Sequence, residues 1–505
     1  EIVSRDWSSD VCSSDLMVVA AAEIAGPGFI NLRLTDSAKR KVVTTVLTQS
    51  HCFGKQSGIN KKVLIEFVSA NPTGPLHVGH GRQAALGDAI SNLMATQGWN
   101  VHREFYYNDA GVQIANLALS VQARAQGLEP GGEGWPEQAY NGEYIADIAR
   151  DFMSKATVAA ADGQPVTASG SVDDIESIRQ FAVAYLRKEQ DIDLQSFGVK
   201  FDCYYLESSL YTDGSVASVV NDLQAIGRCY ESEGALWLKT TDDGDDKDRV
   251  LVKADGELTY FTSDTAYYLD KRARGFNLCI YLLGADHHGY VGRLKALVAC
   301  AGDDPEQNIQ VLIGQMVKIF ENGEEVKLSK RAGTIITLEE LVEKVGVDAA
   351  RYTLSRYPTD TPLTLDVDLL KKHSNDNPVY YVQYAHARIS ALLRNAQELG
   401  VSLNLTDFNE GLLTHERENE LAGAIAQFPQ VLLTAAEVRG PHKIARYLEE
   451  IAGLYHRFYN DCRVLPMGGE NPNALHTARA LLCAATRQLL ANGLDLLGVS
   501  APERM

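Results

Sequence analysis

The sequence has no apolar run approaching the ~18 residues that a membrane-spanning helix requires. Its eight cysteines are scattered and form no Cys-x-x-Cys pair, which argues against a zinc ribbon and against a disulfide framework. The first residues contain no secretory apolar core. At 505 residues, with 45% apolar and 22% charged residues, the chain is typical of a globular protein of about two to four domains. These observations favour a reduced, cytoplasmic protein that does not engage a membrane.

The chain also lacks an excess of basic residues, because 47 Lys and Arg stand against 66 Asp and Glu for a net charge of −19. Non-specific binding to nucleic acid depends on clustered Lys and Arg, so we expect no DNA partner. The charge is uneven: residues 371–505 hold 13 Lys and Arg against 14 Asp and Glu, and their −1 leaves −18 for residues 1–370. An RNA partner therefore remains open at selected faces, although a near-neutral domain is also unremarkable by itself.

Residues 1–16 differ in character from the rest of the chain. They contain a near-duplicate, Ser8–Asp10 and Ser13–Asp15, and show neither a helical nor a strand period. They resemble translated adapter or vector sequence, so we expect no part of the fold to depend on them.

Short apolar runs alternate with helical patterns between residues 60 and 345. The patterns predict strands at 62–68, 102–107, 279–283 and 309–313, a helix at 79–97, and a hairpin formed by 235–239 and 249–253. Alternation of this kind predicts an α/β fold with a doubly wound parallel sheet, interrupted by an insertion at about residues 125–200. From residue 376 onward the strand signals vanish, and helical spacing predicts an all-α bundle.

Two short signatures about 250 residues apart are suited to binding phosphate. His77–His80 (HVGH) follows a predicted strand and a Gly- and Pro-rich turn, and it opens the helix at 79–97. A helix N-terminus presents N–H groups and partial positive charge, and imidazoles three residues apart project to the same side. Lys327–Arg331 (KLSKR) adds flexible positive charge. Together they predict a site that makes or breaks a nucleotide phosphoanhydride.

Each signature has a plainer alternative. The two histidines are also spaced as metal ligands or helix caps, but no nearby Cys or His spacing supplies a third ligand, so we expect no metal centre. The lysine motif taken alone is typical of a solvated basic loop.

In this order, the two signatures resemble the HIGH and KMSKS motifs of class I aminoacyl-tRNA synthetases. Five separate stretches, the first of which includes His77–His80, resemble arginyl-tRNA synthetases of the bacterial type: residues 66–82, 107–114, 284–290, 377–388 and 493–505. The resemblance implies a Rossmann-like catalytic domain with an insertion, followed by a helical anticodon-binding domain. It also implies an arginine–tRNA ligase that works as a monomer and holds no tightly bound cofactor. Such an enzyme activates L-arginine with ATP and Mg²⁺ and transfers arginine to tRNA-Arg.

The resemblance also suggests how the chain divides into segments. Members of this family begin with a globular domain of roughly a hundred residues that contacts the tRNA elbow, and only its closing part, 26–34, is expected here. The expected segments are a leader (1–16), an N-terminal remnant and linker (17–50), a catalytic domain (51–345), a connection (346–375) and an anticodon-binding domain (376–505).

The resemblance assigns roles to residues that match the family motifs. His77, His80, Lys327 and Lys330 are the expected catalytic residues, because charge that develops on phosphate needs preorganised donors. The expected ATP contacts are His77, Gly79, His80, Asp286, His287, Lys327, Ser329 and Lys330. A helix-capping role for Asp286 is the competing interpretation.

Selection of arginine calls for carboxylates, since a guanidinium is planar, always charged and best held by two parallel hydrogen bonds. The residues that match the family's arginine pocket are Glu66, Ser69, Asn71, Glu207, Tyr260 and Asp264. Ordinary surface acidity is the alternative for Glu207 and Asp264. For the anticodon the matching residues are Tyr381, Tyr384 and Met505, although tyrosines at helical spacing are more often part of a core.

Three rival functions are compatible with parts of this pattern. A small nucleotidylyltransferase also uses H-x-G-H, but it needs neither the lysine motif nor a helical C-terminal domain. A non-catalytic RNA-binding relative predicts loss of the histidines or lysines, all of which are present. A synthetase that is crippled by N-terminal truncation retains them and is not distinguished by sequence.

Overall fold

The computed structural model describes residues 19–25, 29–109, 111–212, 214–326 and 336–505. The chain forms two compact units, one made of residues 57–372 and the other of the N-terminal residues up to 56 together with 373–505. Lys327, Ser329 and Lys330 of the second signature lie outside the described residues.

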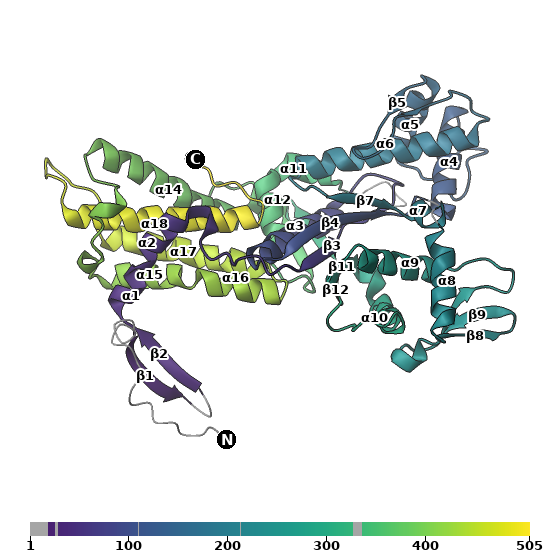
Figure 1. Ribbon diagram of the computed structural model, residues 1–505. Coiled ribbons are helices and arrows are strands. Elements are labelled where there is room, and N and C mark those ends of the chain that lie inside the picture. The colour runs from purple at the N-terminus through teal and green to yellow at the C-terminus, as the bar shows by residue number, and fades with distance from the viewer. Residues whose placement is uncertain (1–18, 26–28, 110, 213, 327–335) are drawn as a thin grey trace, which may run out of the picture. The chain divides into compact units, whose positions relative to one another are not determined.

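The larger unit is built around a five-stranded parallel sheet (Figure 1). Its strands are β3 (Lys62–Glu66), β4 (Asn100–Tyr107), β7 (Cys203–Leu206), β11 (Leu278–Gly284) and β12 (Ile309–Gly314). They lie in the order β12-β11-β3-β4-β7, so the chain winds outward from β3 in one direction and returns to build the other half from β11. The predicted doubly wound α/β fold is confirmed, and its strand order reverses between β3 and β11.

Consecutive side chains at the end of β3 point to opposite faces of the sheet, and each face is covered by helices. Phe67 packs so closely on α3 (Val78–Thr96) that a Cβ placed on Gly87 would lie 2.2 Å from its ring. Glu66 instead reaches α9 (Tyr260–Ala273), where it pairs with Lys271. A buried core on the α9 side also includes residues of α8 (Ser215–Ala225), α10 (Val291–Cys300) and β11.

The insertion between β4 and β7 has a core of its own, formed by three helices. These are α4 (Val112–Ala125), α5 (Tyr144–Met153) and α6 (Ile175–Ser196), with a small ribbon of β5 (Thr157–Val158) and β6 (Val166–Thr167). The expected start at about residue 125 is therefore late, because Leu117 and Val121 of α4 already belong to this core.

A second small antiparallel sheet follows α7 (Glu207–Thr212) and α8. The predicted hairpin is confirmed as β9 (Ala235–Leu238) and β10 (Arg249–Val252), and β8 (Cys229–Ser232), which sequence reasoning missed, pairs with β9. Beyond β12 lie β13 (Val317–Glu321), β14 (Glu324–Glu325) and β15 (Leu363–Asp366), with α11 (Leu338–Val345), α12 (Val347–Ser355) and α13 (Val367–Leu370).

The other unit is helical, as the sequence predicts for residues beyond 376. Its main helices are α14 (Pro378–Glu398), α15 (Glu416–Ala426), α16 (Phe428–Glu437), α17 (His442–Asp461) and α18 (Ala474–Leu496). The short helices α1 (Asp36–Arg40) and α2 (Val42–Gln49) belong to the same unit, where the Arg40 guanidinium donates to Asn419 Oδ1 at 2.8 Å.

The N-terminal described residues form a hairpin of β1 (Val19–Ala25) and β2 (Phe29–Leu34). No helix among the described residues is both long and apolar enough to cross a membrane.

Candidate active site

The site begins at a strained turn that directly follows the central strand β3. Val68 and Ser69 both have positive φ, at 69° and 41°, and the Ser69 N–H donates to the Phe67 carbonyl at 3.0 Å. Left-handed backbone is costly for non-glycine residues, about 1–3 kcal/mol each, and is kept where the surroundings impose it. This turn lies at the carboxyl end of β3, beside the point where the strand order reverses, which is where open α/β sheets bind ligands.

His77 and His80 form a capping box at the N-terminus of α3. His77 Nδ1 accepts from the Gly79 N–H at 3.1 Å, and His80 Nδ1 accepts from the His77 N–H at 3.2 Å. The two rings are stacked with centroids 3.7 Å apart. A nitrogen that accepts a hydrogen bond carries no proton, so each neutral ring holds its proton on Nε2. Capping therefore fixes both imidazoles in the form that donates from Nε2, and the capping and phosphate-binding interpretations are compatible.

Gly79 is required by the cap itself. A Cβ on this residue would lie 2.9 Å from His77 Cε1, closer than side chains normally approach. The missing side chain therefore leaves room for the His77 ring as well as for any group that lies against the start of the helix.

The segment that follows the second signature, from residue 336 onward, lies against the first signature. His77 and Thr337 form an antiparallel β-bridge, in which the Leu338 N–H donates to the Leu76 carbonyl at 2.9 Å. Thr337 is the N-cap of α11, and its side chain accepts from the Glu340 N–H. Two helix N-termini are therefore tied together at the place where the lysine motif rejoins the described chain.

Asp286 and His287 follow β11 in a 3-10 turn at Ala285–Tyr290. Both side chains are exposed, and Asp286 Oδ2 lies 3.5 Å from His287 Nε2. They occupy the carboxyl end of β11, across the reversal point from the turn at Ser69. The N-cap position of this turn is Gly284, and Asp286 lies within its first turn.

Asp264 lies close enough to Glu207 to disfavour ionisation of Glu207. Burial raises the pKa of Asp264 to about 6, with repulsion from Glu66 adding to the shift and the Tyr290 hydroxyl, which donates to Asp264, opposing it. Burial also raises the pKa of Glu207, opposed by a hydrogen bond from Tyr106. Two desolvated carboxylates that disfavour their own charge are prepared for a cation.

The remaining predicted arginine contacts differ in their surroundings. Tyr260 stands at the start of α9 with 69% of its surface exposed, and Asn71 Nδ2 donates to Gln113 Oε1 at 2.7 Å. Glu66 is buried and paired with Lys271, and it accepts from Ser69 Oγ at 3.4 Å. Its carboxylate is thus already engaged within the protein.

Sequence reasoning missed Lys271, Tyr106 and Tyr290, which surround the predicted carboxylates. Tyr290 is the last residue of the 284–290 motif, so its place in that motif could have identified it as a site residue. Lys271 had no signal beyond its helical spacing from Tyr267, because its partner Glu66 is 205 residues away in the chain.

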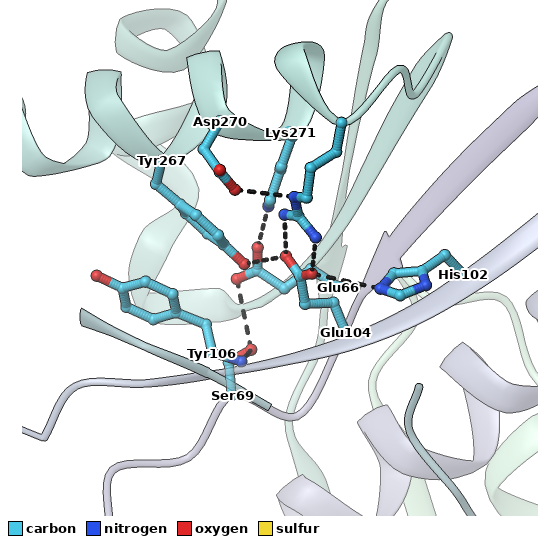
Figure 2. Close-up of polar contacts among 9 residues, drawn as sticks. Glu66, Ser69, His102, Glu104, Tyr106, Tyr267, Asp270 and Lys271 are labelled. Carbon is cyan, nitrogen blue, oxygen red and sulfur yellow. Dashed lines mark hydrogen bonds and ion pairs between the residues drawn. The ribbon is translucent and has the colours of Figure 1, made fainter. Parts of the chain in front are cut away.

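One group of three possible metal ligands occurs in the part of the chain that the structure describes: His102, Glu104 and Cys203. Glu104 accepts hydrogen bonds from Arg274 and from the Tyr267 hydroxyl, as Figure 2 shows for the labelled residues. Arg274 therefore supplies the positive charge that this carboxylate needs.

In the helical unit, Tyr381 and Tyr384 lie on α14 and both rings contact His456 of α17, with centroids 5.3 and 6.1 Å apart. Tyr384 is exposed and stacks on Tyr380, with centroids 6.0 Å apart. The last residues pack on the same helix, where His386 Nδ1 lies 2.8 Å from the Pro502 carbonyl, and Met505 is 55% exposed.

Comparisons with known proteins match nearly the whole chain. The family described as "tRNA synthetases class I (R), catalytic domain" matches residues 42–378, and the "DALR anticodon binding domain" matches residues 382–505. The chain is 55% identical over 504 residues to an arginine–tRNA ligase of Herminiimonas arsenicoxydans, covering 97% of this chain and 86% of the relative. An arginine–tRNA ligase of Paraburkholderia phymatum is 53% identical over 517 residues, with the same coverage.

Solved structures give the same picture. A Campylobacter jejuni protein assigned as an arginyl-tRNA synthetase superposes with a TM-score of 0.82 at 32% identity, covering 94% of this chain and all of that one. Thermus thermophilus arginyl-tRNA synthetase superposes with a TM-score of 0.74 at 22% identity, covering 97% of this chain and 89% of that one, which shows a shared fold.

Proposed function

This chain belongs to the class I arginyl-tRNA synthetases and is an arginine–tRNA ligase, and from that premise we propose how its residues divide the reaction. The reaction joins L-arginine to AMP with release of pyrophosphate, and then transfers arginine to the 3′ end of tRNA-Arg. The observation that carries the proposal is a set of side chains that includes the capped histidines, which follow the central strand β3, and the carboxylates of Glu207, which follows β7, and of Asp264 on α9.

ATP binds at the N-terminus of α3 in this proposal. The Nε2–H groups of His77 and His80 donate to phosphate oxygens, with the helix N-terminus as a further source of positive charge. Lys327 and Lys330 neutralise the departing pyrophosphate, and Ser329 adds a donor. Asp286 and His287 bind the ribose side of the nucleotide from the end of β11. Charge that appears at the α-phosphate during the reaction is stabilised by donors already in place.

Arginine binds beside it, with its guanidinium against Asp264 and Glu207 and the Tyr260 side chain as one wall. Lysine fits such a pair poorly, because an ammonium group cannot pair in parallel with two carboxylates as a planar guanidinium does. Ser69 and Asn71 hold the α-amino and carboxyl end, with Glu66 beneath them. Two raised carboxyl pKa values favour this placement, since a bound guanidinium would stabilise the ionised form that burial disfavours.

The tRNA anticodon binds the helical unit through Tyr381, Tyr384 and Met505. Exposed tyrosine rings stack on unpaired bases, and Tyr384 presents such a ring on α14. We further propose that the enzyme works as a monomer in the cytoplasm.

Mg²⁺ enters with ATP in this proposal. This ion retains water and phosphate oxygens as most of its ligands. Of the three possible ligands that the described chain brings together, His102, Glu104 and Cys203, the one carboxylate is already paired with Arg274, so we do not assign the ion to this group. The protein's part is then to orient the phosphates.

The test is aminoacylation of total tRNA with each of the twenty amino acids in turn. We expect charging with arginine alone. Charging with another amino acid, or none with arginine under any condition, would overturn the proposed pocket, and binding of tRNA without charging would favour a non-catalytic RNA-binding protein.

A further inference from the structure

Four polar side chains recur at helical spacing on one face of α9, namely Tyr267, Asp270, Lys271 and Arg274, the last of which caps the helix. Positions separated by three, four and seven residues lie on the same face of a helix. This face covers a row of residues that pair across the sheet, Tyr281 on β11, Glu66 on β3 and Glu104 on β4 (Figure 2 labels the two carboxylates).

Each buried carboxylate in that row has its own cation. Glu66 is paired with Lys271, whose Nζ also lies 3.8 Å from the Tyr267 ring centroid and 4.0 Å from that of Tyr281. Glu104 accepts from both Nη atoms of Arg274, at 2.5 and 3.0 Å. Lys271 is completely buried, so its ammonium is held by one carboxylate and two aromatic faces and by no solvent.

Glu66 connects this buried face to the strained turn. Ser69 Oγ donates to Glu66 Oε1 at 3.4 Å and accepts from the Tyr106 N–H at 3.1 Å (Figure 2). The serine hydroxyl is therefore fixed at two points while its backbone sits at φ 41°. The contacts run without a break from Lys271 through Glu66 to Ser69, the residue that leads into the arginine site.

We propose that Lys271 is a positioning residue for arginine, which holds Glu66 as an internal anion and through it fixes Ser69 and the left-handed turn at the end of β3. The inference rests on the proposed role of Ser69 in binding arginine, and it identifies Lys271 as the residue that positions Ser69 through Glu66. Glu66 then serves as a support for the site, and Glu207 and Asp264 are the carboxylates left for the guanidinium.

Electrostatic interactions also connect Lys271 and Glu66 with the proposed arginine pocket. The groups that act on Asp264 are Tyr290, Arg293, Glu66 and Lys271, and Asp264 in turn acts on Glu207 and Tyr106. Lys271 favours ionisation of Asp264 and Glu66 opposes it. If the ammonium were absent, the buried Glu66 carboxylate would lose the cation that holds it in place, and with it the fixed acceptor for Ser69 Oγ.

The test is a double-mutant cycle between Lys271→Met and Ser69→Ala, measured as arginine KM in aminoacylation at saturating ATP and tRNA. We expect each single change to raise arginine KM about tenfold and the double change to raise it by no more than about thirtyfold, since both act on one support. KM for ATP should stay within about twofold. If the two single increases in arginine KM multiply to about a hundredfold in the double variant, Lys271 and Ser69 act independently and the proposal is overturned.

A second variant separates positioning from stability. Glu66→Gln/Lys271→Met removes both charges together, so its melting temperature should return toward that of the parent while arginine KM stays raised. It also replaces Lys271→Met in the cycle if that protein does not fold. Recovery of the parent's arginine KM in this variant would overturn the proposal.

Arg479→Met is the matched control, because it breaks another buried ion pair, with Glu418, in the helical unit. It should lower the melting temperature without changing arginine KM. Failure of the proposed pocket itself is recognised separately, since Asp264→Asn would then leave arginine KM unchanged whatever the cycle shows.

Discussion

His77 and Thr337 pair as an antiparallel β-bridge, and each is the N-cap of the helix that follows it. The bridge joins the first signature to the segment that follows the second, and it places two positive helix N-termini side by side. Arg82 adds a second link, because its buried guanidinium donates to the carbonyls of Gln315, Pro358 and Thr361 at 2.7–2.9 Å. The helix that begins with HVGH is thus fixed to the strands and loops on either side of the lysine motif.

Replacing His80 by alanine should lower kcat by roughly a hundredfold or more with little change in arginine KM. The imidazole is proposed to stabilise charge that develops in the transition state, and removing one such donor typically has an effect of this size. The capping hydrogen bond is lost as well, so we expect a destabilisation of about 1 kcal/mol. Steady-state kinetics and a thermal melt measure the two effects.

His476→Ala provides the control for His80. His476 occupies the same capping position in α18, where its Nδ1 accepts from the Asn473 N–H at 3.2 Å, as His80 does in α3. This variant should lose stability and keep its kcat. A similar kcat for both variants would assign His80 to capping alone.

Asp264→Asn should raise arginine KM by roughly tenfold to a hundredfold and leave ATP KM within about twofold, because it removes charge from the guanidinium site at nearly constant volume. Asp303→Asn is a matched control, since Asp303 also accepts from a tyrosine hydroxyl, that of Tyr268, elsewhere on α9. Equal losses for arginine and ATP in the Asp264 variant would indicate general disruption of the site.

The arginine KM should depend on pH with a midpoint near that of Asp264. Burial raises the pKa of this carboxyl to about 6, so it is ionised above that pH and neutral below it. A cation binds the ionised form, so arginine KM should be constant above pH 6 and rise about tenfold per unit below it. Glu207, whose pKa is also raised by burial, acts in the same direction.

Measurement of arginine KM between pH 5 and 8 checks this dependence. In Asp264→Asn the rise at low pH should shrink, because the titrating group is gone. An arginine KM that stays flat across this range in the parent enzyme would contradict the placement of Asp264 against the guanidinium.

Tyr384→Ala should raise the KM for tRNA by roughly tenfold and leave arginine KM unchanged. Stacking of one base on an aromatic side chain contributes about 1–3 kcal/mol, and Tyr384 is the exposed ring of the α14 cluster. Tyr384→Phe keeps the ring and should retain most of the affinity. Leu433→Ala, an exposed apolar residue on α16 of the same unit, should change neither constant, and a tRNA KM that rises equally in that variant would argue against stacking.

The sequence predicted those parts of the molecule whose signals are local. The apolar run at 62–68 and the helical spacing at 79–97 correspond to β3 and α3, and their order along the chain predicted the parallel sheet. The strands β13, β14 and β15 were missed because they are two to five residues long, and because β13 and β15 mix charged with apolar side chains while β14 consists of two glutamates. Strands this short acquire their identity from their neighbours.

The site residues also divide into those with a local sequence signal and those whose role depends on distant parts of the chain. The histidines were predicted because their chemistry and spacing lie within four residues, and the structure adds that capping fixes their Nε2–H form. The engagement of Glu66 by Lys271 was not predictable, since it depends on how β3 and α9 meet across the sheet. A carboxylate in a motif does not reveal by itself whether it faces substrate or an internal cation.

The strand order also governs when the enzyme can become active during its synthesis. Val63 of β3 pairs with Leu278 of β11, which leaves the ribosome 215 residues later, roughly 10–40 s at ordinary elongation rates. Throughout that interval one edge of β3 lacks its neighbouring strand, and Glu66 lacks the lysine that neutralises it. Unpaired strand edges invite association with other chains. The nascent catalytic unit is therefore expected to depend most on chaperones before α9 and β11 emerge, and to gain its nucleotide site only when residues 336–338 return to His77.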